Sequence, residues 1–177
     1  MRRGLDLLFD GAGRLAALLI LAIFLLMLWA SAGRMAGLRV GGVNDIVAWC
    51  CAAASFFAMA HAFKHGDFVR VTLVLDKVPP GVRRVMEIVS LAIAAAAVSY
   101  LAWWAARFTY ESWEFKEMAG GMVAIPIWIP QLSFVIGSLL FVLAVLDELV
   151  IVLRGGKPTY VRMVEERHAR GDFSEDM

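Results

Sequence analysis

Four long stretches of the sequence carry no charged residue, and together they make up nearly half of the chain. They cover residues 15–33, 46–63, 88–106 and 118–146, which are 19, 18, 19 and 29 residues long. A helix needs about 20 apolar residues to cross a bilayer, because each residue rises about 1.5 Å and the hydrocarbon core is about 30 Å thick. A soluble domain of 177 residues could not hide four such segments, so the pattern predicts a membrane protein.

The fold class follows from these stretches. We predict an all-α integral membrane protein with four transmembrane helices, in a membrane domain that covers residues 1–155. The expected spans are about 15–35, 45–63, 85–107 and 126–153, with Pro126 in the first turn of the last helix and Pro130 one turn further in. Residues 156–177 form a polar tail. The first span is longer than the 7–15-residue core of a secretory signal, which favours a retained helix.

The basic residues predict the orientation in the membrane. Thirteen of the 17 lysines and arginines lie in the N-terminal segment, the connector after the second span and the C-terminal tail, and four lie in the other two connectors. Because positive residues stay in the cytoplasm, this bias predicts an N-in/C-in topology with both termini and the long middle connector cytoplasmic. The basic residues form no single stripe, so the sequence gives no sign of nucleic-acid binding.

The middle connector, from Lys64 to Arg84, has a pattern of its own. Apolar residues such as Val69, Val71 and Leu73 interleave with charged ones, and Pro79 begins a Pro-Pro pair that stops any regular element. A lone strand at a membrane surface would leave its backbone unpaired. We therefore predict a short interfacial amphipathic helix between the second and third spans, in contact with membrane lipids.

Three acids lie in or near the spans, where a charge is costly and needs a partner. Glu148 shares a helical stripe with the small residues Ala144 and Gly137, and Glu87 lies on a stripe with Ser90, Ala94 and Ala97. Small residues let helices approach closely. Glu87, Asp147 and Glu148 are therefore predicted to be intramembrane polar packing residues, paired with basic residues such as Lys64, Arg83 or Arg84.

Other residues were considered for chemistry. His61 and His65 would share one helix face, which is compatible with a metal or haem ligand pair but more typical of polar anchors. Cys50 and Cys51 are adjacent, with Cα atoms about 3.8 Å apart against the usual disulfide range of about 4.4–6.8 Å. Nucleophile sets and glycine-rich phosphate loops are absent from the sequence. We expect no enzyme activity, no catalytic residue, no metal site and no cofactor in this chain.

Two motifs resemble the small membrane subunit of TRAP transporters, the DctQ-like family. The first is Phe63-Lys-His-Gly-Asp-Phe-Val-Arg-Val71, followed by Leu73, Leu75 and Pro79. The second is Ser112-Trp-Glu-Phe115 with Ile125-Pro-Ile-Trp-Ile-Pro130 at the start of the fourth span. The resemblance covers roughly residues 10–155. Many relatives carry an acid after the Val-Arg-Val run, where this chain has Thr72.

The resemblance implies a function that the spacing alone does not give. Such a chain would be a scaffold subunit of a secondary transporter in the bacterial inner membrane. In such a transporter, a periplasmic substrate-binding protein delivers an organic acid to a large membrane subunit, which carries it inward with sodium. The sodium would bind to the large subunit. The alternative is a stand-alone four-helix exporter or channel acting as a homo-oligomer, although such small exporters carry a carboxylate in their first span, and residues 15–33 contain none.

The resemblance also implies site residues, which fall into two groups at the two ends of the spans. The cytoplasmic connector and anchor would be formed by Lys64, His65, Gly66 and Arg70. The outer face that docks the partner proteins would be formed by Trp113, Glu114, Pro126, Trp128 and Pro130.

Overall fold

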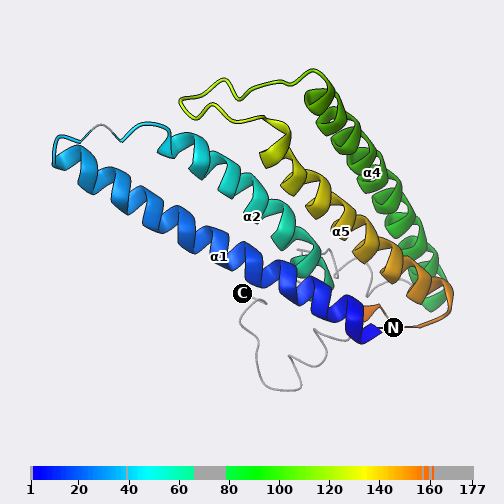
Figure 1. Cartoon of the computed structure of the whole chain (residues 1–177). Coiled ribbons are helices and arrows are strands. Elements are labelled where there is room, and N and C mark those ends of the chain that lie inside the picture. The colour runs from blue at the N-terminus through cyan, green and yellow to red at the C-terminus, as the bar shows by residue number, and fades with distance from the viewer. Residues whose placement is uncertain (1, 39, 66–78, 157, 160, 162–177) are drawn as a thin grey trace, which may run out of the picture.

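The computed structural model describes residues 2–38, 40–65, 79–156, 158, 159 and 161, and in this part of the chain the regular structure consists of four long helices. They are α1 (Arg2–Met35), α2 (Val43–His65), α4 (Pro80–Glu114) and α5 (Trp128–Leu153), labelled as in Figure 1. All four are long and apolar enough to cross a membrane. The prediction of an all-α protein with four such helices is confirmed. The predicted interfacial helix lies outside the described residues, and the orientation in the membrane stays a prediction.

Two of the helices extend well beyond their apolar stretches. α1 has 34 residues and α4 has 35, which corresponds to about 50 Å each against a hydrocarbon core of about 30 Å. α4 begins directly after Pro79, whose extended ψ of 147° starts the helix with Pro80 at its first position. It ends at Glu114, and Lys116 then leaves helical geometry with a φ of 52°. Residues 108–114, which lie beyond the predicted third span of about 85–107, therefore belong to α4.

The fourth helix starts later than predicted. α5 begins at Trp128, so Pro126 lies just before the helix rather than in its first turn. The Pro126 carbonyl accepts a hydrogen bond from the Ile129 N–H at 3.2 Å. Pro130 falls within the first turn, where backbone N–H groups have no partner inside the helix, so its missing N–H removes no helical hydrogen bond.

The helices lie in the spatial order α1, α2, α5, α4, as Figure 1 shows, with contacts between each neighbouring pair. α2 and α5, in the middle, run in the same direction. Two edge-to-face aromatic pairs mark their register: Phe56 with Phe134 at 4.2 Å between ring centroids, and Phe63 with Phe141 at 5.6 Å. Both partners advance by seven residues, or two helical turns, which is the expected spacing along a parallel pair.

Small residues set how closely these helices approach. A Cβ atom added to Gly137 of α5 would lie 2.5 Å from the Cβ of Phe56 and 2.9 Å from its backbone carbon. On the other side of α2, Ala12 and Ala16 of α1 pack with Ala53 and Phe57. Close backbone approach through small residues is a common way for membrane helices to associate.

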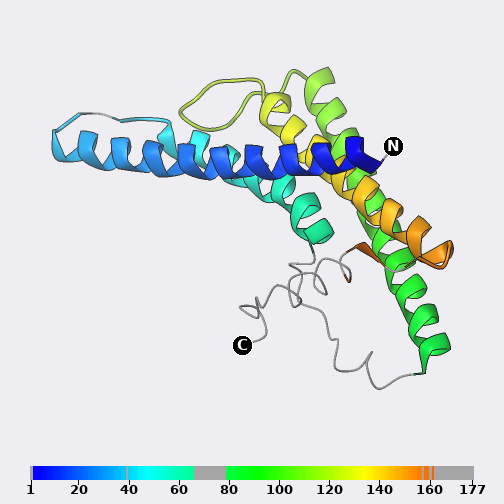
Figure 2. The same ribbon diagram turned by 90° about the horizontal axis from the view of Figure 1, so that it is seen from below.

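The array is open, and α5, one of its two central helices, is the most buried. In the most apolar stretch of α5, 39% of residues are buried, against 11% in α1. The main core cluster joins all four helices near one end of the array, where Phe9 of α1, Phe63 of α2, Leu91 of α4 and Val145 of α5 meet. At the opposite end, the end of α1 and the start of α2 lie apart from the end of α4 and the start of α5 in both views (Figures 1 and 2).

Candidate functional site

The polar groups gather at the two ends of the array, which we name after one residue in each. At the Lys64 end, α1 and α4 begin and α2 and α5 end. At the Asp45 end, α2 and α5 begin and the loop 115–127 connects α4 to α5. Each end has its own set of hydrogen bonds.

A buried ion cluster lies at the Lys64 end. The Nζ of Lys64, in the last turn of α2, donates hydrogen bonds to the carboxylate of Asp147 and, at 2.9 Å, to Oε1 of Glu148. The side chains of Lys64 and Glu148 are 7% and 0% exposed, and that of Asp147 is 24% exposed. A charge removed from water in this way is tolerated only when it is paired and hydrogen-bonded.

Further contacts complete the cluster. The backbone N–H of Thr159 donates to Oε2 of Glu148 at 2.8 Å, so the chain that follows α5 is tied to the same carboxylate. The Phe9 ring of α1 has its centroid 5.4 Å from Nζ of Lys64, within the range of a cation–π contact. The cluster thus fastens three helices and the start of the tail to one another. It consists of one cation shared by two carboxylates.

Beside this cluster, Asp10 of α1 faces two histidines of α2. Its Oδ1 lies 3.6 Å from Nδ1 of His61 and 3.8 Å from Nε2 of His65. The two imidazole rings are tilted by 33° with respect to each other, and their centroids are 4.0 Å apart. The sequence analysis placed the two histidines on one face but did not identify Asp10, because its approach depends on how α1 pairs with α2.

The Asp45 end is held by a different kind of contact. Oδ2 of Asp45, in the first turn of α2, accepts backbone N–H groups from Met122 at 2.7 Å and Val123 at 3.3 Å. A Cβ atom on Gly121 would overlap the same carboxylate, so glycine is needed there for the close approach. Asp45 was missed by the sequence analysis. An acid in a first helical turn, far in sequence from a Gly-Gly pair, was the only available signal.

The loop 115–127 is also ordered by backbone hydrogen bonds of its own. The N–H of Ala119 donates to the carbonyl of Ile125 at 2.9 Å, and that of Ile127 to the carbonyl of Glu117 at 3.0 Å. The hydroxyl of Ser112 donates to Glu117 at 2.9 Å. These bonds form a compact hairpin-like loop.

The residues predicted for partner docking surround this loop. Trp113 is 56% exposed and Glu114 is exposed at the end of α4. Pro126, Trp128 and Pro130 are half-buried around the start of α5. The structure brings all five to the Asp45 end and leaves the first two open to a partner.

The residues predicted for the connector are only partly described. Lys64 is in the buried cluster and His65 faces Asp10, whereas Gly66 and Arg70 lie outside the described residues. Glu87 pairs with Arg83 one turn earlier in α4, at 3.4 Å. Arg84 donates instead to the carbonyl of Leu153 at 3.3 Å, which satisfies an end of α5.

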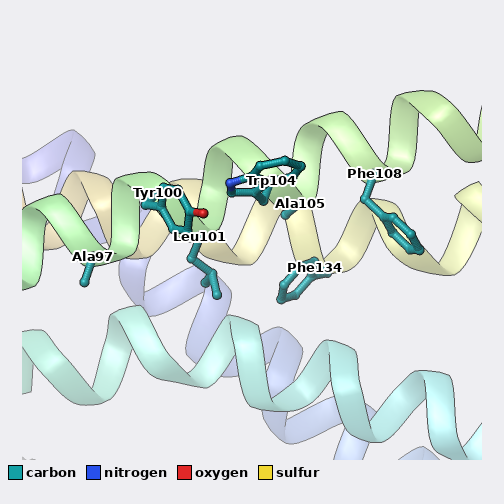
Figure 3. Close-up of a pocket in the computed structure, with 7 residues that line it drawn as sticks. All are labelled: Ala97, Tyr100, Leu101, Trp104, Ala105, Phe108 and Phe134. Atoms are coloured by element: carbon teal, nitrogen blue, oxygen red, sulfur yellow. The ribbon is translucent and has the colours of Figure 1, made fainter.

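An apolar groove of about 450 Å³ opens along α4, where it borders α5. Figure 3 shows its seven lining residues, of which six come from α4 and Phe134 comes from α5. The hydroxyl of Tyr100 and the indole of Trp104 are its polar groups. A surface of this composition suits an acyl chain or apolar side chains of a neighbouring protein.

The arrangement defines a class before any comparison is made: a multi-pass membrane protein with its ion pairs near the helix ends and apolar surface between them. The chain matches the family of tripartite ATP-independent periplasmic transporters, DctQ component, over residues 23–155. Because the match covers well over half of the sequence, the chain belongs to this family and is a transporter component. The resemblance seen in the sequence is thereby confirmed. No curated protein matches the chain.

Proposed function

We propose that this chain is the scaffold subunit of a tripartite transporter and that it supports a large elevator-type subunit during uptake of an organic acid. Uptake would be coupled to sodium and would depend on a periplasmic binding protein. The observation that carries the proposal is the family match over residues 23–155. In this arrangement the chain lies in the bacterial inner membrane with both termini in the cytoplasm, and the Asp45 end faces the periplasm.

The distribution of polar groups supports a static role. A transporter that works alone is expected to have discontinuous helices and polar groups near the middle of the membrane. Here each of α1, α2, α4 and α5 is continuous. The ion pairs between described residues lie within the first or last three turns of their helices.

The exposed surface supports a role in assembly. Large apolar side chains remain uncovered along α4, including Trp103 at 68% and Tyr100 at 67% exposure. The α4 groove adds concave apolar surface to the same helix (Figure 3). Lipid and a large membrane partner are the two environments that accept such a surface.

Co-purification tests the assignment most directly. A tagged chain expressed in its native host should recover a large membrane protein in stoichiometric amount. Reconstitution of the pair with the cognate binding protein should give sodium-dependent uptake. The chain alone, in the same vesicles, should give none. Recovery of the chain without any large membrane protein, or transport by the chain alone, contradicts the proposal.

A charge reversal tests the docking surface at the Asp45 end. Glu114→Arg should lower uptake several-fold when the binding protein is limiting, and less when it is in excess, because rim charges mainly affect the rate of association. Asp6→Arg is the matched control, since Asp6 is also exposed but lies near the start of α1 at the other end. Equal uptake by both variants at limiting binding protein rules out this docking role.

A further inference from the structure

Asp10, His61 and His65 form a cluster whose ligand atoms converge across two helices. One carboxylate oxygen and two imidazole nitrogens lie within 4.8 Å of one another. The side chains are partly open to their surroundings, at 44% exposure for Asp10 and 34% for each histidine. The cluster is therefore not sealed, although the Nδ1 atom of His61 is itself buried.

The hydrogen bonding of His65 directs one nitrogen into this cluster. Its Nδ1 lies 2.9 Å from the backbone carbonyl of His61. A carbonyl only accepts hydrogen bonds, so Nδ1 carries the proton and, in the neutral ring, Nε2 carries the lone pair. Nε2 is the atom that faces Asp10. At metal sites, the nitrogen of a histidine that does not bind the metal commonly donates to a backbone carbonyl, which fixes the tautomer.

His61 presents a second nitrogen to the same point. Its Nδ1 is buried and has no hydrogen-bond partner among the described residues. Its ring lies against Gly13 of α1, where an added Cβ would be 2.7 Å from the ring. Gly13 is three residues after Asp10, on the same helical face, so α1 supplies both the carboxylate and the space for the imidazole.

The spacing leaves room for an ion between the three groups. A hydrogen bond between these groups would need a separation of about 2.7–3.2 Å, whereas the two distances from Asp10 are 3.6 and 3.8 Å. Ligands bound to zinc at about 2.0–2.1 Å in a tetrahedron are about 3.3 Å apart. Both distances from Asp10 are thus too long for a direct hydrogen bond and within about 0.5 Å of the ligand separation in a tetrahedral zinc site.

We propose that Asp10, His61 and His65 bind a divalent transition-metal ion, with zinc as the principal candidate, and that this ion fastens the first turns of α1 to the end of α2. Two histidines and one carboxylate are a ligand set that zinc accepts, with water in the fourth position. The site is separate from the Lys64 cluster and independent of the transporter role. It revises the expectation from sequence that this chain holds no metal.

Zinc titration of the full chain tests the site. The protein should carry a histidine-free affinity tag, be stripped with a chelator, and be titrated in detergent by calorimetry, with bound metal measured separately. The expected result is one zinc ion per chain. Asp10→Asn and His65→Gln should each weaken binding by about 100-fold or more, because loss of a ligand costs more than the roughly 10–100-fold loss seen when only a hydrogen-bond partner of a ligand is changed.

Two controls separate this site from other donors. His168→Gln changes the remaining histidine, and the double variant Cys50→Ala/Cys51→Ala removes both thiols; neither should alter binding. Zinc should also raise the Tm of the wild-type chain and of both controls, but not that of Asp10→Asn. Absence of stoichiometric binding to the wild-type chain, or undiminished binding by Asp10→Asn and His65→Gln, overturns the proposal.

Discussion

The two ends of the helix array are held together by different chemistry. At the Lys64 end, charged side chains from distant helices meet in a buried cluster in which Glu148 is fully covered. At the Asp45 end, one partly exposed carboxylate accepts two backbone N–H groups from a loop. Because a buried charge has no water to replace a lost partner, we expect the Lys64 end to depend more on a single residue than the Asp45 end.

Removal of the cation at the Lys64 end should cause the largest loss in the free energy of unfolding. Lys64→Met leaves Asp147 and Glu148 facing each other without their shared partner, and breaking a buried ion pair from one side costs about 3–5 kcal/mol. The expected outcome is a large loss in the free energy of unfolding, measured by denaturant titration in detergent. Lys116→Met, at an exposed loop position, should change it by less than about 0.5 kcal/mol.

A double variant checks that the cost comes from uncompensated charge. Lys64→Met combined with Glu148→Leu removes both the cation and its most buried partner, and replacement of a buried ion pair by apolar groups is often close to neutral. The double variant should therefore recover part of the stability lost in Lys64→Met. Recovery should stay incomplete, because the N–H of Thr159 loses its acceptor. A double variant less stable than Lys64→Met contradicts this account.

The Asp45 end should respond less strongly. Asp45→Ala removes the acceptor of two loop N–H groups and should cost about 1–3 kcal/mol. Asp45→Asn keeps an oxygen acceptor and should cost less. Hydrogen exchange at Met122 and Val123 is the direct measurement, and both amides should exchange faster in Asp45→Ala. The neighbouring exposed Asn44 supplies the control Asn44→Ala. Equal exchange in the two alanine variants argues against the two hydrogen bonds to Asp45.

Loss of an exposed ion pair at the same end should have the smallest effect on the free energy of unfolding. Arg107 and Glu111 lie one turn apart on α4 at 2.9 Å, with side chains 56% and 44% exposed. Glu111→Gln should lower the free energy of unfolding by no more than about 0.5 kcal/mol, since such pairs are screened by solvent. The same chemical change at Glu148 should cost several times more. Equal losses for Glu111→Gln and Glu148→Gln would show that burial does not set the difference.

The sequence was sufficient to predict the fold class and the small-residue face of the helix that carries Glu148. Apolar length alone identifies four helices, and the spacing of Glu148 with Ala144 and Gly137 predicts a small-residue face that the structure places against α2. It was insufficient for the helix ends. The length of an apolar stretch indicates only which residues can contact lipid. The helix α4 continues to Glu114 because nothing in residues 108–114 stops a helix.

The contacts that sequence reasoning missed depend on tertiary register. Asp45 binds N–H groups of the main chain, and every non-proline residue has one, so no side-chain pattern identifies Met122 or Val123 in advance. Asp10 reaches the histidines only because the turn after α1 sets which residues of α1 and α2 face each other. A shift of one residue would rotate Asp10 by about 100° around α1 and move it away from them.

The length of α1 has a mechanical consequence. A continuous helix of 34 residues is a stiff rod of about 50 Å, and a bilayer core of about 30 Å could enclose it only at an inclination beyond the usual 0–40°. Part of the rod therefore projects past the hydrocarbon. A change of about 10° in its inclination displaces one tip by about 9 Å relative to the other. Because hydrophobic mismatch changes helix tilt, a change in bilayer thickness would be expected to move Phe9 and Asp10, which lie near the start of α1.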